Sequence, residues 1–291
     1  MTDRDSTARG RELGAELRKR RLAAGLQLSY VARKLGWSPA KLSRMESGGR
    51  GQSEVDVAIY LTFCGVHKEE LNELLELARE PDDGYLIRPH GQRLPDELRS
   101  LVFHETTAVN IHEYDPLLIP GLLQTEAYAR ALFYWTGLIP QEEVEARVQA
   151  RMDRQALMRR PDPPVFDFFI HESALRSQVG GEQVMNEQLL QLVFQTSLSH
   201  CVIRIVPSTA GPHGAFNGPF RVMRYAEHGP VVYLETFTTS IFLDGRADIE
   251  TYGRILARIS RLALSVGESR DFLAQLASEH DQPEEERDDR A

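Results

Sequence analysis

Two short amphipathic segments separated by a glycine constrain the fold of this chain more than any other feature. The apolar residues of the first segment, residues 27–35, recur at helical spacing: Leu28, Val31, Ala32 and Leu35. Gly36 follows directly and is suited to ending a helix. Ser38 and Pro39 then begin a second helix, because Ser is a favoured N-cap and Pro a favoured first helical residue. We therefore expect two short helices joined by a tight turn.

The same pattern continues on both sides of this pair. Apolar residues at helical spacing, bounded by glycine or polar residues, predict helices at residues 11–24, 27–35, 38–47, 55–64 and 68–80. The run Pro-Asp-Asp-Gly at 81–84 interrupts the series. The sequence therefore predicts an all-α N-terminal domain of five helices, with a helix-turn-helix (HTH) at its centre.

The second half of the chain mixes helical and strand periods. Helices are expected at 95–107, 122–135, 141–160, 183–198, 246–267 and 269–278, and strands at 108–114, 165–171, 201–207, 219–226 and 231–237. This pattern predicts an α+β C-terminal domain. The expected organisation is a flexible N-terminus at 1–10, the HTH domain at 11–80, a linker at 81–94, the α+β domain at 95–278, and a disordered acidic tail at 279–291.

Charge is unevenly distributed along the chain. The formal net charge is −9, yet residues 9–51 carry eleven Lys and Arg against three Glu, a balance of +8 that leaves −17 for the remainder. A basic module joined to an acidic body indicates a polyanionic partner for one end. A solvated helical surface explains the charge as well, so charge alone does not decide between the two.

Composition also bears on the compartment. No apolar run approaches the roughly 20 residues of a membrane span, and the N-terminus lacks the apolar core of a signal peptide. Cys64 and Cys201 lie far apart and form no disulfide framework. We expect a cytoplasmic protein that does not engage membranes.

The second helix of the pair divides into two faces. Leu42 and Met45 share one side and can pack on the preceding helix. The remaining surface is small and basic: Ala40, Lys41, Ser43, Arg44 and Ser47. Such a ridge fits a major groove, where Arg can pair with guanine O6 and N7. An ordinary helical hairpin explains the apolar face equally well, but it does not explain the small, basic face.

The stretch ELRKRRLAAGLQLSYVARKLGWSPAKLSRMESGGR, residues 16–50, resembles the Cro/C1-type (XRE) HTH domain, and the resemblance covers roughly residues 11–79. The matching positions are Arg21, Gly25, Val31, Ala32, Leu35, Gly36, Ser38, Leu42, Ser43 and Glu46. The resemblance implies binding to double-stranded DNA as a homodimer, with half-sites about one helical turn apart. It also implies a structural salt bridge between Glu46 and Arg21.

The resemblance assigns contacts to individual positions. Pro39, Ala40 and Arg44 would face bases, and Gln27, Lys41, Ser47 and Arg50 would lie near phosphates. The complete predicted DNA-binding set is Gln27, Ser38, Pro39, Ala40, Lys41, Ser43, Arg44, Ser47 and Arg50. Leu28 stands where many members have Gln, so one polar contact at the start of that helix is expected to be lost. Direct readout then rests heavily on Arg44 and on DNA shape.

Three arginines of the predicted 141–160 helix fall on one stripe: Arg147, Arg151 and Arg154. They are candidates for binding an anion or an acidic partner. A solvated helix paired with neighbouring acids is the alternative.

Signatures of catalysis are missing from the sequence. It contains no GxSxG, HExxH, Walker loop or GxGxxG. Three His–Glu pairs, at 104–105, 112–113 and 171–172, could suggest a metal, but no third ligand lies nearby in sequence. We expect no enzyme activity, no cofactor and no metal site.

Several ordered motifs of the second half resemble the C-terminal domain of WhiJ-like regulators of filamentous actinobacteria. They are HEYDPLLIPGLLQTEAYARAL, RMDRQ, FIHESALRSQVGG, MNEQLLQL, IVPSTAGPHGAFNGPFRVMRY and VVYLETFTTSIFLD, within roughly residues 100–275. The resemblance implies a transcription regulator that is often encoded beside a small partner protein thought to modulate it. It supplies no functional residue for this domain.

The leading hypothesis is a dimeric, sequence-specific transcriptional regulator that acts as a repressor, with a C-terminal domain that binds a small partner protein or a ligand. One alternative is an antitoxin-like interaction protein for which DNA binding is secondary. Another is an enzyme with a DNA-targeting head, against which the missing catalytic motifs count.

Overall fold

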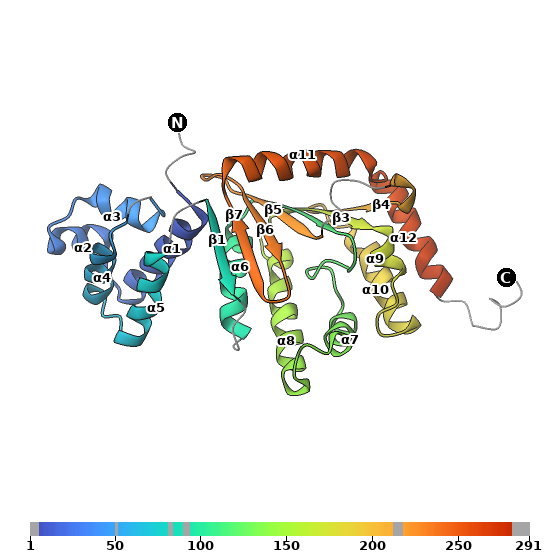
Figure 1. The fold of residues 1–291 in the computed structure, drawn as a ribbon, viewed down its shortest axis with the longest axis horizontal. Helices are drawn as coiled ribbons and strands as arrows, with labels where there is room; N and C mark the ends of the chain where they lie inside the picture. Colours follow the sequence, from blue (N-terminus) through green and yellow to red (C-terminus); the bar gives the residue numbers. More distant parts are fainter. Residues whose placement is uncertain (1–5, 50–51, 81–83, 90–93, 212–217, 281–291) are drawn as a thin grey trace, which may run out of the picture. The chain divides into compact units, whose positions relative to one another are not determined.

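The structure is a computed structural model that describes residues 6–49, 52–80, 84–89, 94–211 and 218–280 (Figure 1). The chain forms two compact units. The first contains Met1–His90 and Tyr225–Ile249, and the second contains Gly91–Arg224 and Glu250–Ala291. Each unit is therefore assembled from segments that are far apart in the sequence.

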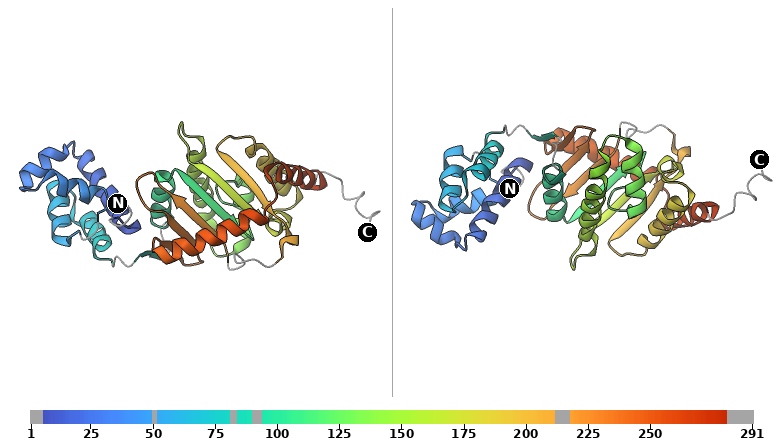
Figure 2. Two further views of the ribbon diagram at one scale, coloured as in Figure 1. Left: turned by 90° about the horizontal axis from the view of Figure 1, so that it is seen from above. Right: turned by 90° about the horizontal axis from the view of Figure 1, so that it is seen from below.

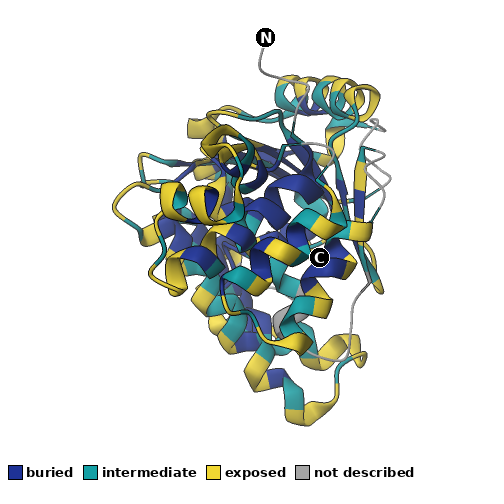
Figure 3. Cartoon of the chain, turned by 90° about the vertical axis from the view of Figure 1, so that its left-hand side faces the viewer, coloured by how far each residue is buried: buried dark blue, intermediate teal, exposed yellow. Residues whose placement is uncertain are grey.

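Five helices form the N-terminal part of the first unit, as the sequence predicts. They are α1 (Ala8–Ala23), α2 (Leu28–Leu35), α3 (Pro39–Glu46), α4 (Glu54–Phe63) and α5 (Lys68–Arg79). Their inward-facing side chains form one apolar core: Leu13, Leu17, Val31, Ala32, Leu42, Met45, Val57, Tyr60, Leu61, Cys64, Leu74, Leu75 and Leu77. Burial of one such Leu or Val contributes about 1.5–3 kcal/mol, so this core holds the five helices together. Buried residues are dark blue in Figure 3.

Helix α1 approaches the end of α3 very closely. A Cβ on Gly14 would lie 2.7 Å from the carbonyl oxygens of Met45 and Glu46 and from the amide nitrogen of Gly48. A Cβ on Gly10 would lie 2.5 Å from the carbonyl oxygen of Gly48. Only glycine leaves room for backbone contact at this distance. The two glycines therefore set how closely α1 and α3 pack.

Three strands belong to the same unit as these helices: β1 (Tyr85–Pro89), β6 (Val231–Glu235) and β7 (Thr239–Leu243). Strand β7 pairs antiparallel with β1 on one side and with β6 on the other. Leu86 of β1 lies opposite Phe242 of β7, which in turn lies opposite Tyr233 of β6. All three side chains are buried.

The start of α1 is attached to these strands. The Ala8 amide donates a hydrogen bond to Oδ2 of Asp244, just after β7. Arg11 donates from Nη1 to the carbonyl oxygen of Gly229, 3.0 Å away, and its guanidinium lies 4.8 Å from the centre of the Tyr225 ring. Helix α1 thus begins at Ala8, inside the 1–10 segment that was expected to be flexible. The Thr7 side chain caps it, and backbone and side-chain groups of residues 225–244 contact its first turn. We call this set of contacts the α1 clasp.

A further contact of the α1 clasp comes from β1. Arg88 lies 3.3 Å from Oε2 of Glu12 in α1 and 2.6 Å from Oε1 of Glu80 at the end of α5. Residues 81–94 were expected to form a linker, but Tyr85–Pro89 form a strand there. The sequence YLIRP does not alternate between apolar and polar residues and ends in proline, so it does not indicate a strand.

The second unit is built on β2 (Asn110–Asp115), β3 (Val165–His171), β4 (Cys201–Val206) and β5 (Phe220–Arg224). Strands β2, β3 and β4 are parallel, and β5 pairs antiparallel with β2. Within this unit the strand order is β5-β2-β3-β4. The expected class, an all-α HTH part followed by an α+β part, is confirmed.

The helices of the C-terminal half are α6 (Leu94–Thr107), α7 (Glu126–Thr136), α8 (Gln141–Arg154), α9 (Glu172–Arg176), α10 (Glu182–Gln195), α11 (Arg246–Leu262) and α12 (Val266–His280), with short 3-10 turns at Gln155–Arg159 and Ser208–Ala210. Figure 2 shows α11 lying across one face of the sheet, in the view from above. Arg204 of β4 secures the end of α11 by donating to the carbonyl oxygens of Ser260, Ala263 and Leu264 at 2.8–2.9 Å. Cations stabilise helix C-termini in this way.

Three elements depart from the sequence-based expectation in this half. Strand β7 and the short helix α9 were missed, and α7 begins at Glu126 rather than Leu122. Residues before Thr125 form turns instead, and the Leu123 amide bonds to the Pro120 carbonyl. The Thr125 side chain then caps α7 by accepting from the Tyr128 amide. The predicted acidic tail lies outside the described residues from position 281 onward.

A pair of helical glycines tests the close approach of α1. Gly14→Ala should destabilise the protein by about 1–3 kcal/mol, because its methyl group would overlap backbone atoms that cannot move independently. Gly253→Ala in α11 meets no atom within 4 Å and should stabilise by about 0.5–1 kcal/mol through helix propensity. Chemical denaturation measures both. Equal effects of the two substitutions would contradict the packing described here.

Candidate nucleic-acid interface

The turn between α2 and α3 has the geometry that its sequence predicts. Gly36 ends α2 in the left-handed conformation with φ 68°, which favours glycine. The Trp37 amide bonds to the carbonyl oxygen of Ala32 at 2.8 Å. Oγ of Ser38 accepts a hydrogen bond from the Lys41 amide at 3.1 Å and caps α3. The local sequence therefore determines where α3 begins and how it leaves the turn.

A buried ion pair fixes the other end of α3. Arg21 donates from Nε and Nη2 to the two oxygens of Glu46, at 2.6 and 2.7 Å. Tyr60 of α4 donates its hydroxyl to Oε1 of Glu46 at 2.6 Å, and Arg21 also bonds to the Leu26 carbonyl oxygen at 2.8 Å. The salt bridge implied by the family resemblance is confirmed, and Tyr60 is an additional partner. We call Arg21, Glu46 and Tyr60 the α3 anchor.

The α3 anchor changes the acidity of its members. Burial opposes ionisation of Glu46, but hydrogen bonds from Arg21 and Tyr60 outweigh it and hold the pKa of Glu46 below its usual value of 4.5. Burial and the neighbouring carboxylate raise the pKa of the Tyr60 hydroxyl. Glu46 is therefore a carboxylate at neutral pH, and Tyr60 remains a hydrogen-bond donor to it.

Most of the predicted DNA-binding residues lie on α3 or its caps. Leu42 and Met45 are buried on the inner side of this helix. Seven residues of the predicted set are exposed: Gln27, Ser38, Pro39, Ala40, Ser43, Arg44 and Ser47. Gln27 is the N-cap position of α2 and makes no side-chain capping bond. Arg50 lies outside the described residues.

Lys41 differs from these seven exposed residues because it is half-buried and ion-paired. Its Nζ lies 2.8 Å from Oδ2 of Asp56 in the first turn of α4 and 4.1 Å from the centre of the Trp37 ring. Its side chain is 35% exposed and that of Asp56 28%. The charge of Lys41 is therefore shared with a carboxylate and an indole of the same unit.

Much of the basic charge in residues 9–51 serves the structure. Arg9, Arg11 and Arg21 are buried, and Arg9 donates to the carbonyl oxygens of Leu77 and Ala78. Arg20 is paired with Glu16 and Glu70. The exposed basic residues of the described segment are Arg18, Lys19, Arg33, Lys34 and Arg44. The balance of +8 thus overstates the charge available to a polyanion.

The three arginines of α8 do not form an exposed stripe. Arg154 is 7% exposed at its side chain and lies 3.3 Å from Oε2 of Glu105. Arg151 donates to Oε1 of Gln124 at 2.6 Å and lies over the Phe133 ring. Arg147 lies 3.6 Å from Glu143. The expected anion-binding surface is therefore reduced to the partly exposed Arg147 and Arg151, and its binding role stays a prediction.

Arg154 belongs to a buried group of four charges. Arg221 of β5 bonds to Glu105 of α6 at 3.0 Å and to Glu113 of β2 at 2.9 Å. All four side chains are at least nine-tenths buried. Burial raises the pKa of Glu113, and Arg221 only partly opposes this. Two arginines and two glutamates join one strand pair to α6 and α8, and sequence reasoning did not foresee this grouping.

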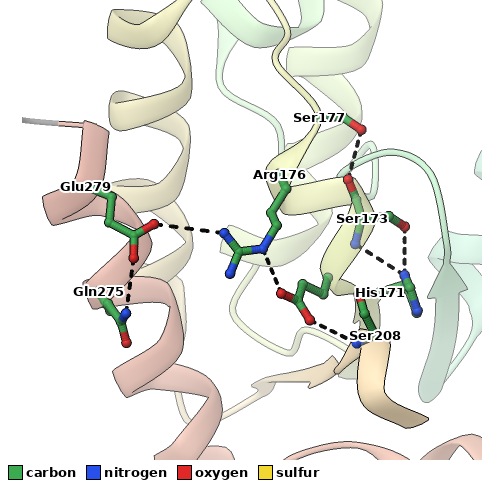
Figure 4. Close-up of polar contacts among 8 residues, drawn as sticks. His171, Ser173, Arg176, Ser177, Ser208, Gln275 and Glu279 are labelled. Atoms are coloured by element: carbon green, nitrogen blue, oxygen red, sulfur yellow. Dashed lines mark hydrogen bonds and ion pairs between the residues drawn. The ribbon is translucent and has the colours of Figure 1, made fainter. Parts of the chain in front are cut away.

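Polar side chains also gather where parallel strands β3 and β4 end (Figure 4). Nδ1 of His171 lies 2.6 Å from Oγ of Ser173, and Ser173 donates to the Pro116 carbonyl oxygen. Glu172 accepts from the Ser208 amide at 2.9 Å and from Nε of Arg176 at 2.6 Å, and Arg176 also lies 3.9 Å from Glu279 of α12. These bonds hold the connections after β3 and β4 together. Burial lowers the pKa of His171.

The three His–Glu pairs occupy separate places in the second unit. His104 is buried, His112 lies 3.0 Å from Asp167, and His171 contacts Ser173. Within the part of the chain that the structure describes, no three His, Cys, Asp or Glu residues are grouped as metal ligands would be. No described helix has the length and apolar character needed to cross a membrane.

Comparison with known families assigns both parts of the chain. Residues 98–275 match a family described as a domain of unknown function, DUF5753. The chain belongs to the DUF5753 family. Residues 12–74 of this DUF5753 protein match a family described as a helix-turn-helix domain. Comparisons with curated proteins and with solved structures give no significant match. The chain is accordingly a DNA-binding regulator with an XRE-like HTH head.

Three features near α3 were missed by sequence reasoning: Tyr60, Asp56 and the position of Trp37. Asp56 is an acidic residue in the first turn of a helix, a position that acidic residues commonly occupy. That position does not reveal a partner 15 positions earlier. Tyr60 reads as an ordinary apolar residue of an amphipathic helix, so its bond to Glu46 has no sequence signal.

The α3 anchor predicts a pH-dependent effect on stability. Glu46→Gln should lower the free energy of unfolding at neutral pH by about 3–5 kcal/mol, because Arg21 loses its buried counterion. The folded-state pKa of Glu46 lies below 4.5, so the stability it contributes is present above that pH and is lost as pH falls through the folded pKa. Denaturant unfolding of both proteins between about pH 7 and pH 3 measures this.

The matched control for this experiment is Glu54→Gln, which removes an exposed carboxylate paired with Arg79. It should change stability little, since exposed pairs contribute little. A difference between wild type and Glu46→Gln that stays constant down to low pH would contradict the assigned charge state.

The buried group of four charges gives a second test. Arg154→Met should destabilise by about 3 kcal/mol because Glu105 keeps its buried charge and loses one counterion. Arg159→Met, at an exposed neighbouring position, should stay within about 0.5 kcal/mol. Thermal unfolding compares the two. A neutral Arg154→Met would contradict the structural role assigned to this arginine.

Proposed function

We propose that the protein is a dimeric, sequence-specific transcriptional repressor in which the exposed face of α3 enters the major groove of double-stranded DNA. The observation that carries this proposal is that the α3 anchor fixes α3 while the outer face of this helix stays exposed. Arg21, Glu46 and Tyr60 hold one end of α3 while Ser38 caps the other. A helix held at both ends can present side chains to base edges in one orientation.

Roles within the interface follow from chemistry and position. Arg44 is the exposed charged residue of α3, and it is proposed to donate to guanine. Pro39 and Ala40 provide apolar contact, while Ser43 and Ser38 flank them. Gln27, Lys41, Ser47 and Arg50 are proposed to lie near phosphates. Because few donors face the bases, DNA shape should contribute to specificity.

The second unit is proposed to bind a small partner protein or a ligand that modulates DNA binding, as in WhiJ-like actinobacterial regulators. Exposed apolar side chains at the end of α7 support a partner surface: Tyr134, Trp135 and Leu138 are 47%, 68% and 66% exposed. Apolar residues gathered in this way are typical of interaction sites. Arg147 and Arg151 remain candidates for the same surface. A regulator of this kind would act in the cytoplasm, beside the chromosome.

Arg44→Ala tests the assignment of the recognition helix. It should weaken binding to the preferred site by about 10-fold to 100-fold, corresponding to about 1–3 kcal/mol, and relax sequence preference at one base pair. Gel-shift titration with promoter fragments flanking its own gene measures this. Lys68→Ala on α5 removes an equal charge from an exposed position of the same unit and is the matched control.

Affinity should also fall steeply as salt rises, since phosphate contacts release counterions. Unchanged affinity and preference in Arg44→Ala would show that α3 is not the reading helix. Binding that is flat between about 50 and 200 mM salt would contradict the phosphate contacts.

A further inference from the structure

Lys41 is proposed to lie near a DNA phosphate, yet its ammonium group already has two partners within its own unit. Oδ2 of Asp56 lies 2.8 Å from Nζ, and the centre of the Trp37 ring lies 4.1 Å from it. Both distances are typical of strong attraction, as an ion pair and as a cation–π contact. Lys41 therefore presents little free charge to DNA.

Asp56 and Trp37 are held firmly enough to compete for this lysine. Asp56 is in the first turn of α4, where the helix dipole stabilises a negative charge. Trp37 is packed against the apolar core of the five helices, and its amide bonds to Ala32. Because both side chains are attached to backbone that is already fixed, binding the ammonium group costs them little conformational entropy.

Lys41 is distinctive within the proposed interface. Among its described residues, Lys41 makes an ion pair within the protein, whereas Arg44 is exposed on the outer side of α3. Among the residues that the structure describes, the other ion pairs described above for this unit, such as Arg79 with Glu54 on α5 and α4, involve no residue proposed to bind DNA. Within the proposed DNA-binding face of α3, the carboxylate of Asp56 therefore competes at the position of Lys41.

We propose that Asp56 competes with the DNA backbone for Lys41 and so limits sequence-independent binding. A phosphate that binds Lys41 must share the ammonium group with the carboxylate of Asp56 or displace it, and in both cases two like charges come close together. This cost is the same on every sequence, whereas base contacts by Arg44 form only at the preferred site and offset it there. Because the cost is equal on every sequence, it leaves the ratio of specific to sequence-independent affinity unchanged. It lowers the absolute affinity for duplexes that lack the base contacts. The inference rests on the DNA-binding function proposed above.

Sequence-independent binding provides a direct test that needs no knowledge of the operator. A random-sequence duplex of about 30 base pairs is titrated with the full chain at several salt concentrations, by fluorescence anisotropy. Asp56→Asn should bind roughly threefold to tenfold more tightly at low salt. The slope of log affinity against log salt should steepen by about 0.9, the contribution of one additional phosphate contact.

The control variant is Glu73→Gln, which removes one negative charge from an exposed position of α5 and leaves Lys41 paired. It should give a smaller gain in affinity and an unchanged salt slope. In the Asp56→Asn background, Lys41→Gln should abolish the gain, so that the double variant binds no more tightly than Lys41→Gln alone. This double-mutant cycle establishes whether Asp56 acts through Lys41.

Circular dichroism checks that each variant is folded, and Asp56→Ser replaces Asp56→Asn if the latter is not. An Asp56 variant that binds no more tightly than Glu73→Gln, or a gain that persists without Lys41, would overturn the inference while DNA binding itself stands. Absence of any duplex binding by the wild-type chain at low salt would overturn the proposed function as well.

Discussion

The position of α3 depends on the ion pair between Arg21 and Glu46. This contact joins the end of α1 to the end of α3, and the Tyr60 hydroxyl extends it to α4. Removing two charges from water is costly, so the pair adds less net stability than its short distances suggest. Its contribution is orientation, because Glu46 can satisfy its oxygens only when three helices meet in one arrangement. The exposed face of α3, and every proposed base contact, follows from that arrangement.

Arginine serves both structure and recognition in this chain, and burial separates the two roles. Arg21 fixes α3 and Arg11 holds the start of α1, while Arg44 stays exposed. In the second unit, Arg154 and Arg221 neutralise Glu105 and Glu113 between strands and helices. A guanidinium suits buried pairing because it remains charged and offers several donors in one plane. Counting basic residues along the sequence therefore measures the charge available to DNA poorly.

The local parts of this fold were predictable from sequence, and the long-range parts were not. Gly36, Ser38 and Pro39 determine their turn through their own backbone preferences, and the apolar period around Leu42 defines the inner face of α3. The family resemblance supplied the Arg21–Glu46 pair. Strands β1 and β7 were missed because their sequences, YLIRP and TSIFL, do not alternate between apolar and polar residues. They pair with each other across about 150 residues of sequence. The bond between Lys41 and Asp56 joins two helices whose relative placement only the packed core decides.

The α1 clasp has a consequence for how the chain can be divided. Ala8, Arg11 and Glu12 take their partners from residues that lie between 76 and 236 positions away. A fragment ending near residue 80 would expose Arg11 and Glu12 without those partners, although it would contain every residue of the HTH match. The boundary of the family match and the boundary of the cooperative folding unit are therefore different. If the HTH domain were replaced by that of another protein, the first helix of the replacement would have to fit the residues around Gly229 and Asp244.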